Sequence, residues 1–338
     1  MVKTAVVALE YQPYCDAQID RQATYNQAAS NDKITVDYWK ETWINQTRMN
    51  KARVGSFKEN SVGKLWGLNK FKPAIVVGAG PCLKDNAHVL LENPGITVVS
   101  CLHNFHYLED LGIKVDYYVS LDSGPITIEE VSEGGDKDKD YWALTKDKVL
   151  IAYVGSHPDL IRQWQGEIYF FNAVIPDLDT ISRIDSIETF RADFSTGGNV
   201  LGACTYFAKA VLGSSIVAFM GASMSFSYGE KPQFHPWASK YDANMGNCLT
   251  VTDIYGIKVK TWQSYHNFKL FYDWLFTCNF PGIWYNCSEG GTLGATTQGN
   301  LRQLVQMDLK DFFNLLNIQH HIKDQFENPD TCDRKILY

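Results

Sequence analysis

The hydrophobic and polar positions of the chain follow two different patterns. Up to about residue 71 the sequence is rich in Asn, Gln, Lys and Asp, with Val36, Trp39 and Trp43 at spacings of three and four residues within 36–53. This spacing predicts an amphipathic helix that packs against a larger body. We therefore interpret residues 1–71 as a helical N-terminal appendage.

From residue 72 onward, short apolar runs alternate with helical patterns. The runs that predict buried strands lie at 74–80, 96–100, 115–121, 149–154, 168–171, 215–220 and 282–285. The segments with helical patterns lie at 85–92, 105–111, 199–212, 265–278 and 300–316. Buried strands that alternate with helices are typical of a parallel sheet covered on both faces. The sequence thus predicts an α/β fold with a Rossmann-like, mostly parallel sheet at 72–298, helices on both faces, and a C-terminal helix and tail at 299–338.

Composition excludes several classes of protein. The chain has 338 residues, 45% apolar residues and a net charge of −7, so neither a disordered protein nor a general nucleic-acid binder is expected. We expect no secretory signal peptide and no membrane span. The eight cysteines are scattered without a C-x-x-C pair, which favours a reducing, cytoplasmic compartment over disulfides or a zinc site. The aromatic fraction of 13% is high, and its rings could serve the core or stack on a ligand.

Ligands of parallel sheets bind at the carboxyl ends of the strands, so the residues there are candidates for chemistry. Gly78 and Gly80, followed by Pro81, form a loop that could cradle a phosphate before a helix, or simply make a tight turn. The third glycine of a dinucleotide fingerprint is replaced by Leu83, and no acidic residue ends the second strand, where Asn104 follows. NAD binding is therefore not favoured.

Carboxylates flank the third predicted strand. Asp122 follows it and Asp116 stands near its start, and either could hold Mg²⁺ beside a phosphate, or cap a turn. Farther along, the run from Ser195 to Asn199 contains paired glycines before a helix. Such a loop can approach an anion or a nucleobase edge closely.

Two later loops add further candidates. Gly221 and Ser223 follow the sixth strand, and the loop continues to His235, a possible general base that could equally be a surface histidine. Glu289 precedes paired glycines after the last strand, in a loop that could fold against a ligand or form a turn.

Four motifs in this order and spacing carry a family resemblance: GAGPCL (78–83), SCLHNFHYLEDLGIKVDYYVSLD (100–122), TGGNVLGACTYFAKAVLGSSIVAFMGASMSF (196–226) and NCSEGG (286–291). Over about residues 72–300 the chain resembles the MptE-like family, which includes archaeal 6-hydroxymethylpterin diphosphokinases and bacterial motility accessory factors. The same core is similar to a family of bacterial sialyltransferases.

The resemblance implies a Rossmann-like nucleotide site. Archaeal members transfer diphosphate from ATP to a pterin alcohol with Mg²⁺, and the motility factors are linked to adding nonulosonic sugars from a CMP donor to flagellin. The candidate nucleotide-binding residues are Gly78, Gly80, Pro81, Asn104, Gly197, Gly198, Asn199, Gly221, Ser223, Gly290 and Gly291. The candidate catalytic residues are Asp122, His235 and Glu289, and the candidate metal ligands are Asp122 and Asp116.

Two positions depart from the family pattern. Cys82 stands where the family usually has Ser, and Ser223 stands where it usually has Asp. A Mg²⁺-dependent diphosphokinase-type transfer is the leading hypothesis, with ATP and a hydroxymethylpterin-like alcohol as substrates. A glycosyltransferase using a CMP-activated sugar and a glycan acceptor is the alternative, and a non-catalytic nucleotide-binding protein is the third.

Overall fold

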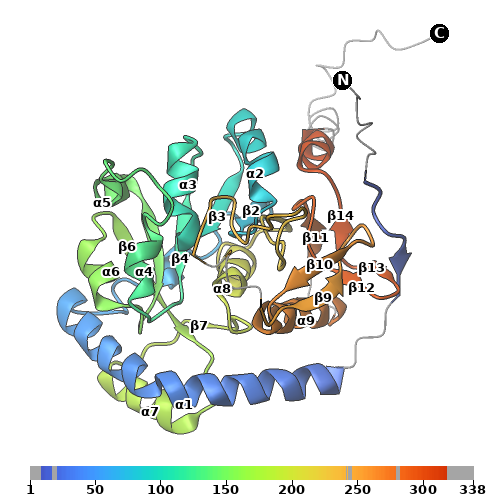
Figure 1. Cartoon of the computed structure of the whole chain (residues 1–338). Helices are drawn as coiled ribbons and strands as arrows, with labels where there is room; N and C mark the ends of the chain where they lie inside the picture. Colours follow the sequence, from blue (N-terminus) through green and yellow to red (C-terminus); the bar gives the residue numbers. More distant parts are fainter. Residues whose placement is uncertain (1–8, 17–20, 241, 243–245, 279–281, 318–338) are drawn as a thin grey trace, which may run out of the picture.

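The computed structural model describes residues 9–16, 21–240, 242, 246–278 and 282–317. Its centre is a nine-stranded sheet in the order β14-β11-β8-β2-β3-β4-β5-β6-β7 (Figure 1). The strands are β2 (Pro73–Val77), β3 (Thr97–Cys101), β4 (Tyr117–Ser120), β5 (Val149–Tyr153), β6 (Glu167–Ala173), β7 (Asp193–Phe194), β8 (Ile216–Met220), β11 (Ile283–Asn286) and β14 (Val305–Gln306). All eight neighbouring pairs are parallel, which confirms the predicted Rossmann-like α/β fold.

The central strands are buried because their side chains are apolar on both faces. Ile75, Val76 and Val77 of β2 are fully buried, as are Val217 and Phe219 of β8. Continuous apolar runs of this kind are expected where helices cover a parallel sheet. The helices around it are α2 (Leu83–Asn86), α3 (Phe105–Asp110), α4 (Ile126–Glu130), α5 (Tyr141–Leu144), α6 (Pro158–Gln163), α7 (Leu178–Ile187), α8 (Val200–Tyr206) and α9 (Gln263–Thr277).

Strand order reverses direction between β2 and β8. The chain runs from β2 outward through β3, β4, β5 and β6, whereas β8 returns to pair with the other side of β2. From β2 the chain continues toward β3, and from β8 it continues toward β11, so it leaves these two adjacent strands in opposite directions across the sheet. Such a switch point is where open α/β sheets bind ligands.

A long helix, α1 (Arg21–Val54), runs along one side of the molecule and packs against α7, α9 and α6 (Figure 1). Its buried Asn50 donates two hydrogen bonds of 2.9 Å to the carbonyls of Val154 and Ser156. The Glu41 carboxylate accepts hydrogen bonds from both terminal guanidinium nitrogens of Arg183, which lies on α7. The helix predicted at 36–53 is thus present and extends farther toward the N-terminus.

The ends of the chain correct two predictions. Residues 300–316 were expected to be one helix, but β13 (Gly299–Leu301) and β14 come first, and only residues 309–317 are helical. The appendage at 1–71 is not wholly helical either, because β1 (Tyr14–Cys15) pairs with β13, which also pairs with β12 (Ala295–Thr296). The predicted tail at 318–338 and the extreme N-terminus at 1–8 lie outside the described residues.

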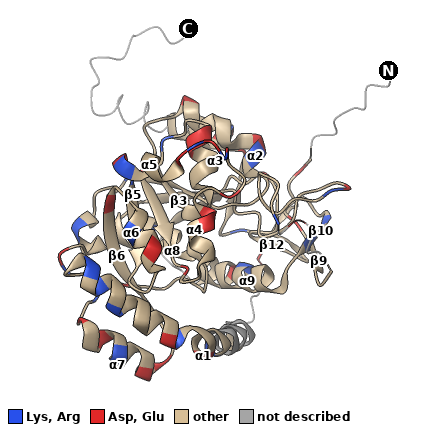
Figure 2. Cartoon of the chain, turned by 60° about the vertical axis from the view of Figure 1, so that its left-hand side comes forward, with Lys and Arg blue, Asp and Glu red and all other residues tan. Residues whose placement is uncertain are grey.

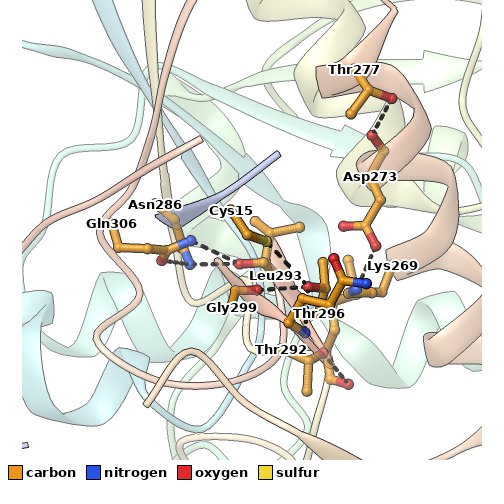
Figure 3. A network of polar contacts seen from close by, with 12 residues as sticks. Cys15, Lys269, Asp273, Thr277, Asn286, Thr292, Leu293, Thr296, Gly299 and Gln306 are labelled. Carbon is orange, nitrogen blue, oxygen red and sulfur yellow. Dashed lines mark hydrogen bonds and ion pairs between the residues drawn. The ribbon is translucent and has the colours of Figure 1, made fainter. Parts of the chain in front are cut away.

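Long-range hydrogen bonds explain why strands replace the expected helix. The Asn300 side chain donates to the carbonyls of Gln12 and Ile254, at 3.2 and 3.0 Å. Asn286 and Gln306 bond to one another at 2.8 Å and converge on the Leu293 carbonyl (Figure 3). These bonds hold 299–306 extended, so tertiary pairing overrides the helical spacing of the apolar residues.

Two further features complete the fold. A β-hairpin, β9 (Leu249–Thr252) and β10 (Lys258–Thr261), lies outside the main sheet and was not predicted. The short 3₁₀ and π segments are η1 (Val62–Leu65), η2 (Ala87–Glu92), η3 (Leu102–Asn104), η4 (Thr145–Asp147) and η5 (Phe207–Val211). None of the described helices is both long and apolar enough to cross a membrane.

Candidate functional site

A cavity of about 960 Å³ lies at the carboxyl edge of the sheet. Its floor is formed by the ends of β2, β4 and β8 and the loops that follow them, including residues 78–80, 119–123, 221–222 and 224–225. Its walls come from α1 and α9, with the loop at 195–201 between them. A volume of this size accommodates a nucleotide with an attached group.

Aromatic rings dominate the walls. Those that line the cavity are Trp39, Trp43, Tyr153, Phe234, Tyr265, Phe268, Phe271 and Trp274. Aromatic rings from several distant parts of the chain therefore surround one space, where flat rings can stack on a base, a pterin or a sugar. The sequence left open whether such rings pack in the core or stack on a ligand, because helical spacing does not distinguish a core face from a cavity wall.

The two loops of the switch point pack directly on each other. A Cβ on Gly78 would lie 2.6 Å from the Gly221 carbonyl oxygen, and one on Gly221 would lie 2.3 Å from that of Gly78. The N–H groups of Gly78 and Gly80 donate to the carbonyls of Met220 and Gly221, at 2.8 and 2.7 Å. Because these N–H groups are used within the fold, the first loop cannot offer them to a phosphate. The glycines form part of the cavity floor by permitting close packing.

The two departures from the family pattern touch each other behind this floor. Cys82 Sγ lies 2.5 Å from Ser223 Oγ, and both residues are buried. Burial raises the pKa of the Cys82 thiol to about 12, so it stays protonated. Cys82, Ser223 and Pro81 do not line the cavity. The pair therefore acts in packing the two switch loops together.

The second glycine loop lies at the cavity. Gly197 and Gly198 have positive φ values of 59° and 78°, and a Cβ on Gly197 would lie 2.3 Å from the Phe271 ring. Asn199 caps α8, since its side-chain oxygen accepts from Gly202 N at 2.9 Å. All three predicted residues of this loop line the cavity.

His235 also lines the cavity and belongs to a cluster of rings. Its ring centroid is 4.4 Å from that of His103, and it stacks on Trp237 at 4.9 Å. Its Nδ1 lies 2.9 Å from the Ala79 carbonyl oxygen. Because a carbonyl only accepts, Nδ1 carries the hydrogen and Nε2 the lone pair. Burial, with the nearby charge of His103, lowers the pKa of His235 to about 4, so the ring is neutral near pH 7.

His103 also lines the cavity, although it was not among the site residues predicted from the sequence. Its Nε2 lies 3.1 Å from Glu133 and its Nδ1 3.5 Å from Glu130, so carboxylates flank both sides of the ring. The hydrogen bond from His103 lowers the pKa of Glu133, whereas burial raises the pKa of Glu130. The position of His103 just beyond the second predicted strand was the available signal.

Asp122 is exposed at the cavity after β4. One carboxylate oxygen accepts from Gly124 N at 2.7 Å, and no described lysine or arginine pairs with it. Among the described residues, none of those that line the cavity is Lys or Arg. No group of three or more His, Cys, Asp or Glu in the described ranges is arranged to hold a metal ion. Mg²⁺ can nevertheless bind through one or two carboxylates together with substrate phosphates.

Two of the predicted residues, Asp116 and Asn104, do not line the cavity. Asp116, at the amino end of β4, accepts from Val98 N at 2.9 Å and pairs with Lys114 at 3.0 Å. It cannot join Asp122 at one metal site, because the two stand at opposite ends of the same strand. Asn104 is buried and donates to Ser100 Oγ at 3.2 Å.

The last loop is also structural. Glu289 accepts from Asn86 Nδ2 and from Leu309 N, both at 3.0 Å, and so fastens the C-terminal helix. Its φ is +57°. A Cβ on Gly291 would lie 2.1 Å from the Ser223 carbonyl oxygen. Neither these two residues nor Gly290 lines the cavity, so the expected ligand-binding role of this loop finds no support in the geometry.

Comparisons with known proteins agree with this architecture. The model of the family described as 6-hydroxymethylpterin diphosphokinase MptE-like matches residues 45–229. No curated protein sequence matches the chain. The solved structure of the MAf glycosyltransferase from Magnetospirillum magneticum AMB-1 is similar in fold, with a TM-score of 0.53 and 13% identity. That match covers 82% of this chain and 42% of the other, so this chain spans less than half the length of that protein.

Proposed function

The chain belongs to the MptE-like family, and we propose that it is a transferase that binds a nucleotide donor in the cavity and transfers a group to an acceptor hydroxyl. The observation that carries this proposal is the large aromatic cavity at the switch point, with Asp122 and His235 both at its lining. Aromatic walls suit the flat rings of a nucleobase or an acceptor. The Asp122 carboxylate suits binding of Mg²⁺ beside a phosphate, and the His235 ring suits proton transfer.

The specific reaction we propose first is transfer of diphosphate from ATP to a hydroxymethylpterin-like alcohol. The acceptor oxygen forms a bond to the β-phosphorus, the bond from that phosphorus to the α-phosphate oxygen breaks, and AMP leaves. Asp122 would hold Mg²⁺, which would neutralise the phosphates in a cavity whose described lining has no Lys or Arg. Its exposed carboxylate, with one oxygen bonded only to a backbone N–H, fits that role.

His235 is the residue that we propose as general base. The acceptor hydroxyl loses its proton during the transfer, and Nε2 would receive it because Nδ1 is committed to the Ala79 carbonyl. The lowered pKa, about 4, keeps the ring able to accept a proton throughout the neutral range. His103, with its flanking carboxylates, would hold the His235 ring in place by contact.

Glycosyl transfer is the second candidate, and one observation favours it. The family's usual carboxylate at position 223 is here Ser223, buried against Cys82, so this chain offers fewer carboxylates for a metal. The single phosphate of a CMP-activated sugar needs less charge neutralisation by a metal ion than the triphosphate of ATP does. The acceptor oxygen would then bond to the anomeric carbon as CMP leaves, with His235 again taking the proton.

Nucleotide binding and turnover distinguish these proposals. We expect calorimetry to detect ATP binding that requires Mg²⁺ and that Asp122→Asn weakens at least about tenfold. Asp116→Asn is the matched control, since it makes the same chemical change at the other end of β4, and it should bind as the wild type does. Formation of AMP from ATP with a hydroxymethylpterin acceptor would complete the test.

Each other outcome has a defined meaning. Binding of CMP well above ATP, with release of CMP from a sugar donor, would replace the diphosphokinase proposal by the glycosyltransferase one. His235→Asn should lower kcat by about 10²-fold or more in either case, with nucleotide affinity retained. Nucleotide binding without turnover of any donor would support the non-catalytic alternative.

A further inference from the structure

A turn at the amino edge of the sheet, opposite the cavity, exposes three large apolar side chains. Trp66, Leu68 and Phe71 are 72%, 62% and 77% exposed. Ile283, at the start of β11, is also exposed. Its N–H donates to the Ser215 carbonyl, and the Ser215 N–H donates to the Lys72 carbonyl at the end of this turn. Clustered exposed apolar side chains mark interaction surfaces more often than isolated ones do. We call residues 64–72 the basic-aromatic turn.

The basic-aromatic turn is firmly attached to the body of the protein. The N–H groups of Gly67, Asn69 and Phe71 donate to the carbonyls of residues 211–213, at 2.8, 3.0 and 3.3 Å. The buried Asn69 side chain donates to the Pro73 carbonyl and to Ser214 Oγ. With its backbone bonded inward, the turn presents its apolar side chains outward in a fixed arrangement.

Phe71 has an unusual backbone conformation for such an exposed residue. Its φ is +64°, in the left-handed region that bulky side chains rarely adopt. The exposed ring gains little packing within the protein to offset this strain. A strained residue that contributes little to the core points to a role outside the folded chain.

The charge of the basic-aromatic turn differs from that of the whole molecule. Lys64, Lys70 and Lys72 are exposed, and none of them pairs with a carboxylate of the described residues. No Asp or Glu occurs between Glu59 and Asp85, although the chain carries a net charge of −7. Elsewhere basic and acidic positions are interspersed, as on α7 (Figure 2).

We propose that the basic-aromatic turn docks the protein on a membrane surface that contains anionic lipids. Trp and Phe favour the interfacial zone of a bilayer, and lysines beside them are attracted to anionic headgroups. A protein partner is less favoured, because lysine is depleted from the cores of protein interfaces. The docking does not depend on the transferase reaction. It would leave the cavity, at the opposite edge of the sheet, facing away from the lipid.

Vesicle sedimentation of the full chain tests this docking. We expect binding to vesicles of phosphatidylcholine with about 30 mol % phosphatidylserine, little binding to phosphatidylcholine alone, and weaker binding above about 0.1 M salt. Each of Lys64→Glu, Lys70→Glu and Lys72→Glu should lower the affinity at least about fivefold.

An apolar variant and matched charge controls complete the design. Trp66→Ser with Leu68→Ser and Phe71→Asn should lower the affinity at least about tenfold, and Asn suits the left-handed position. The single controls Lys137→Glu, Lys146→Glu and Lys231→Glu each change the net charge as much as one lysine variant of the turn does, at exposed sites elsewhere. Each control should bind nearly as well as the wild type.

Three results would overturn the proposal. The first is absence of sedimentation with phosphatidylserine vesicles. The second is equal loss of binding in the controls, which would mean that only net charge matters. The third is concentration-dependent self-association without lipid that the apolar variant abolishes, which would assign the surface to a second copy of the chain. Unchanged thermal unfolding of each variant establishes that it is folded.

Discussion

His106 offers a quantitative test of the electrostatics beside the cavity. The ring lies on α3, only 2% exposed, with its edge against Trp237 at 4.5 Å, and neither ring nitrogen has a hydrogen-bond partner among the described residues. Burial, and then the charge of His103, lowers the pKa of His106 from 6.5 to about 4, while Asp110 and Glu133 act in the opposite direction.

The direction of the pH effect follows from this lowered pKa. Between about pH 4 and 6.5 the unfolded chain binds a proton on His106 that the folded chain does not, so the free energy of unfolding falls as the pH falls. The contribution reaches at most about 3 kcal/mol below both pKa values and is about 2 kcal/mol between pH 7 and pH 5. His235, whose pKa is also lowered to about 4, adds to the same window.

We expect His106→Leu to remove about 2 kcal/mol of the stability loss between pH 7 and pH 5. At pH 7 the variant should be within about 1 kcal/mol of the wild type, because Leu fills a similar volume and leaves no polar atom unsatisfied. Urea unfolding at both pH values measures this, with His88→Leu as the control on an exposed histidine. If wild type and His106→Leu lose equal stability on acidification, the assigned pKa is wrong.

Three further predictions concern the fold and the site. Lys269 and Asp273 form an ion pair inside α9 that is almost fully buried (Figure 3), so Lys269→Met or Asp273→Leu alone should destabilise by about 3–5 kcal/mol, whereas the double variant should be near neutral in urea unfolding. Gly221→Ala should cost more than about 2 kcal/mol, because φ is +61° and the new Cβ would strike the neighbouring loop, while Gly95→Ala, which meets nothing within 4 Å, should be tolerated. The acid limb of kcat/KM should lie well below the 6.5 of an ordinary histidine, since the pKa of His235 is about 4; a limb at 6.5 would argue against His235 as the base.

Seven of the nine strands of the main sheet could be predicted from the sequence, because buried parallel strands are recognisable as local apolar runs, whereas the two-residue strands β7 and β14 were not predicted. The same runs placed Asp122, His235 and the glycine loop at 197–198 on the carboxyl edge, where the structure brings them to one cavity. Which of these residues lie close together was harder to predict. Asp116 was grouped with Asp122 as a candidate metal ligand, although it stands near the start of the same strand and the structure places the two at opposite ends of β4.

Pairings between distant segments were the main source of error. β1 and β13 pair at Tyr14 and Asn300, and nothing in the local spacing of 300–316 reveals that partner. His103 was overlooked because its importance comes from contacts with Glu130, Glu133 and His235, which different loops bring together. Local patterns describe elements well, whereas a site made by several loops depends on the tertiary fold.

The floor and the two helical walls of the cavity come from different parts of the chain. The family match spans 45–229, which includes the switch-point glycines, His103 and Asp122. The rings of Trp39 and Trp43 on α1 precede it, and those of α9 follow it. Substitutions in the two helices can therefore reshape the space without touching the floor, and His235 also lies outside the matched segment. A fragment limited to the matched segment would retain the floor but lose both helical walls of the cavity.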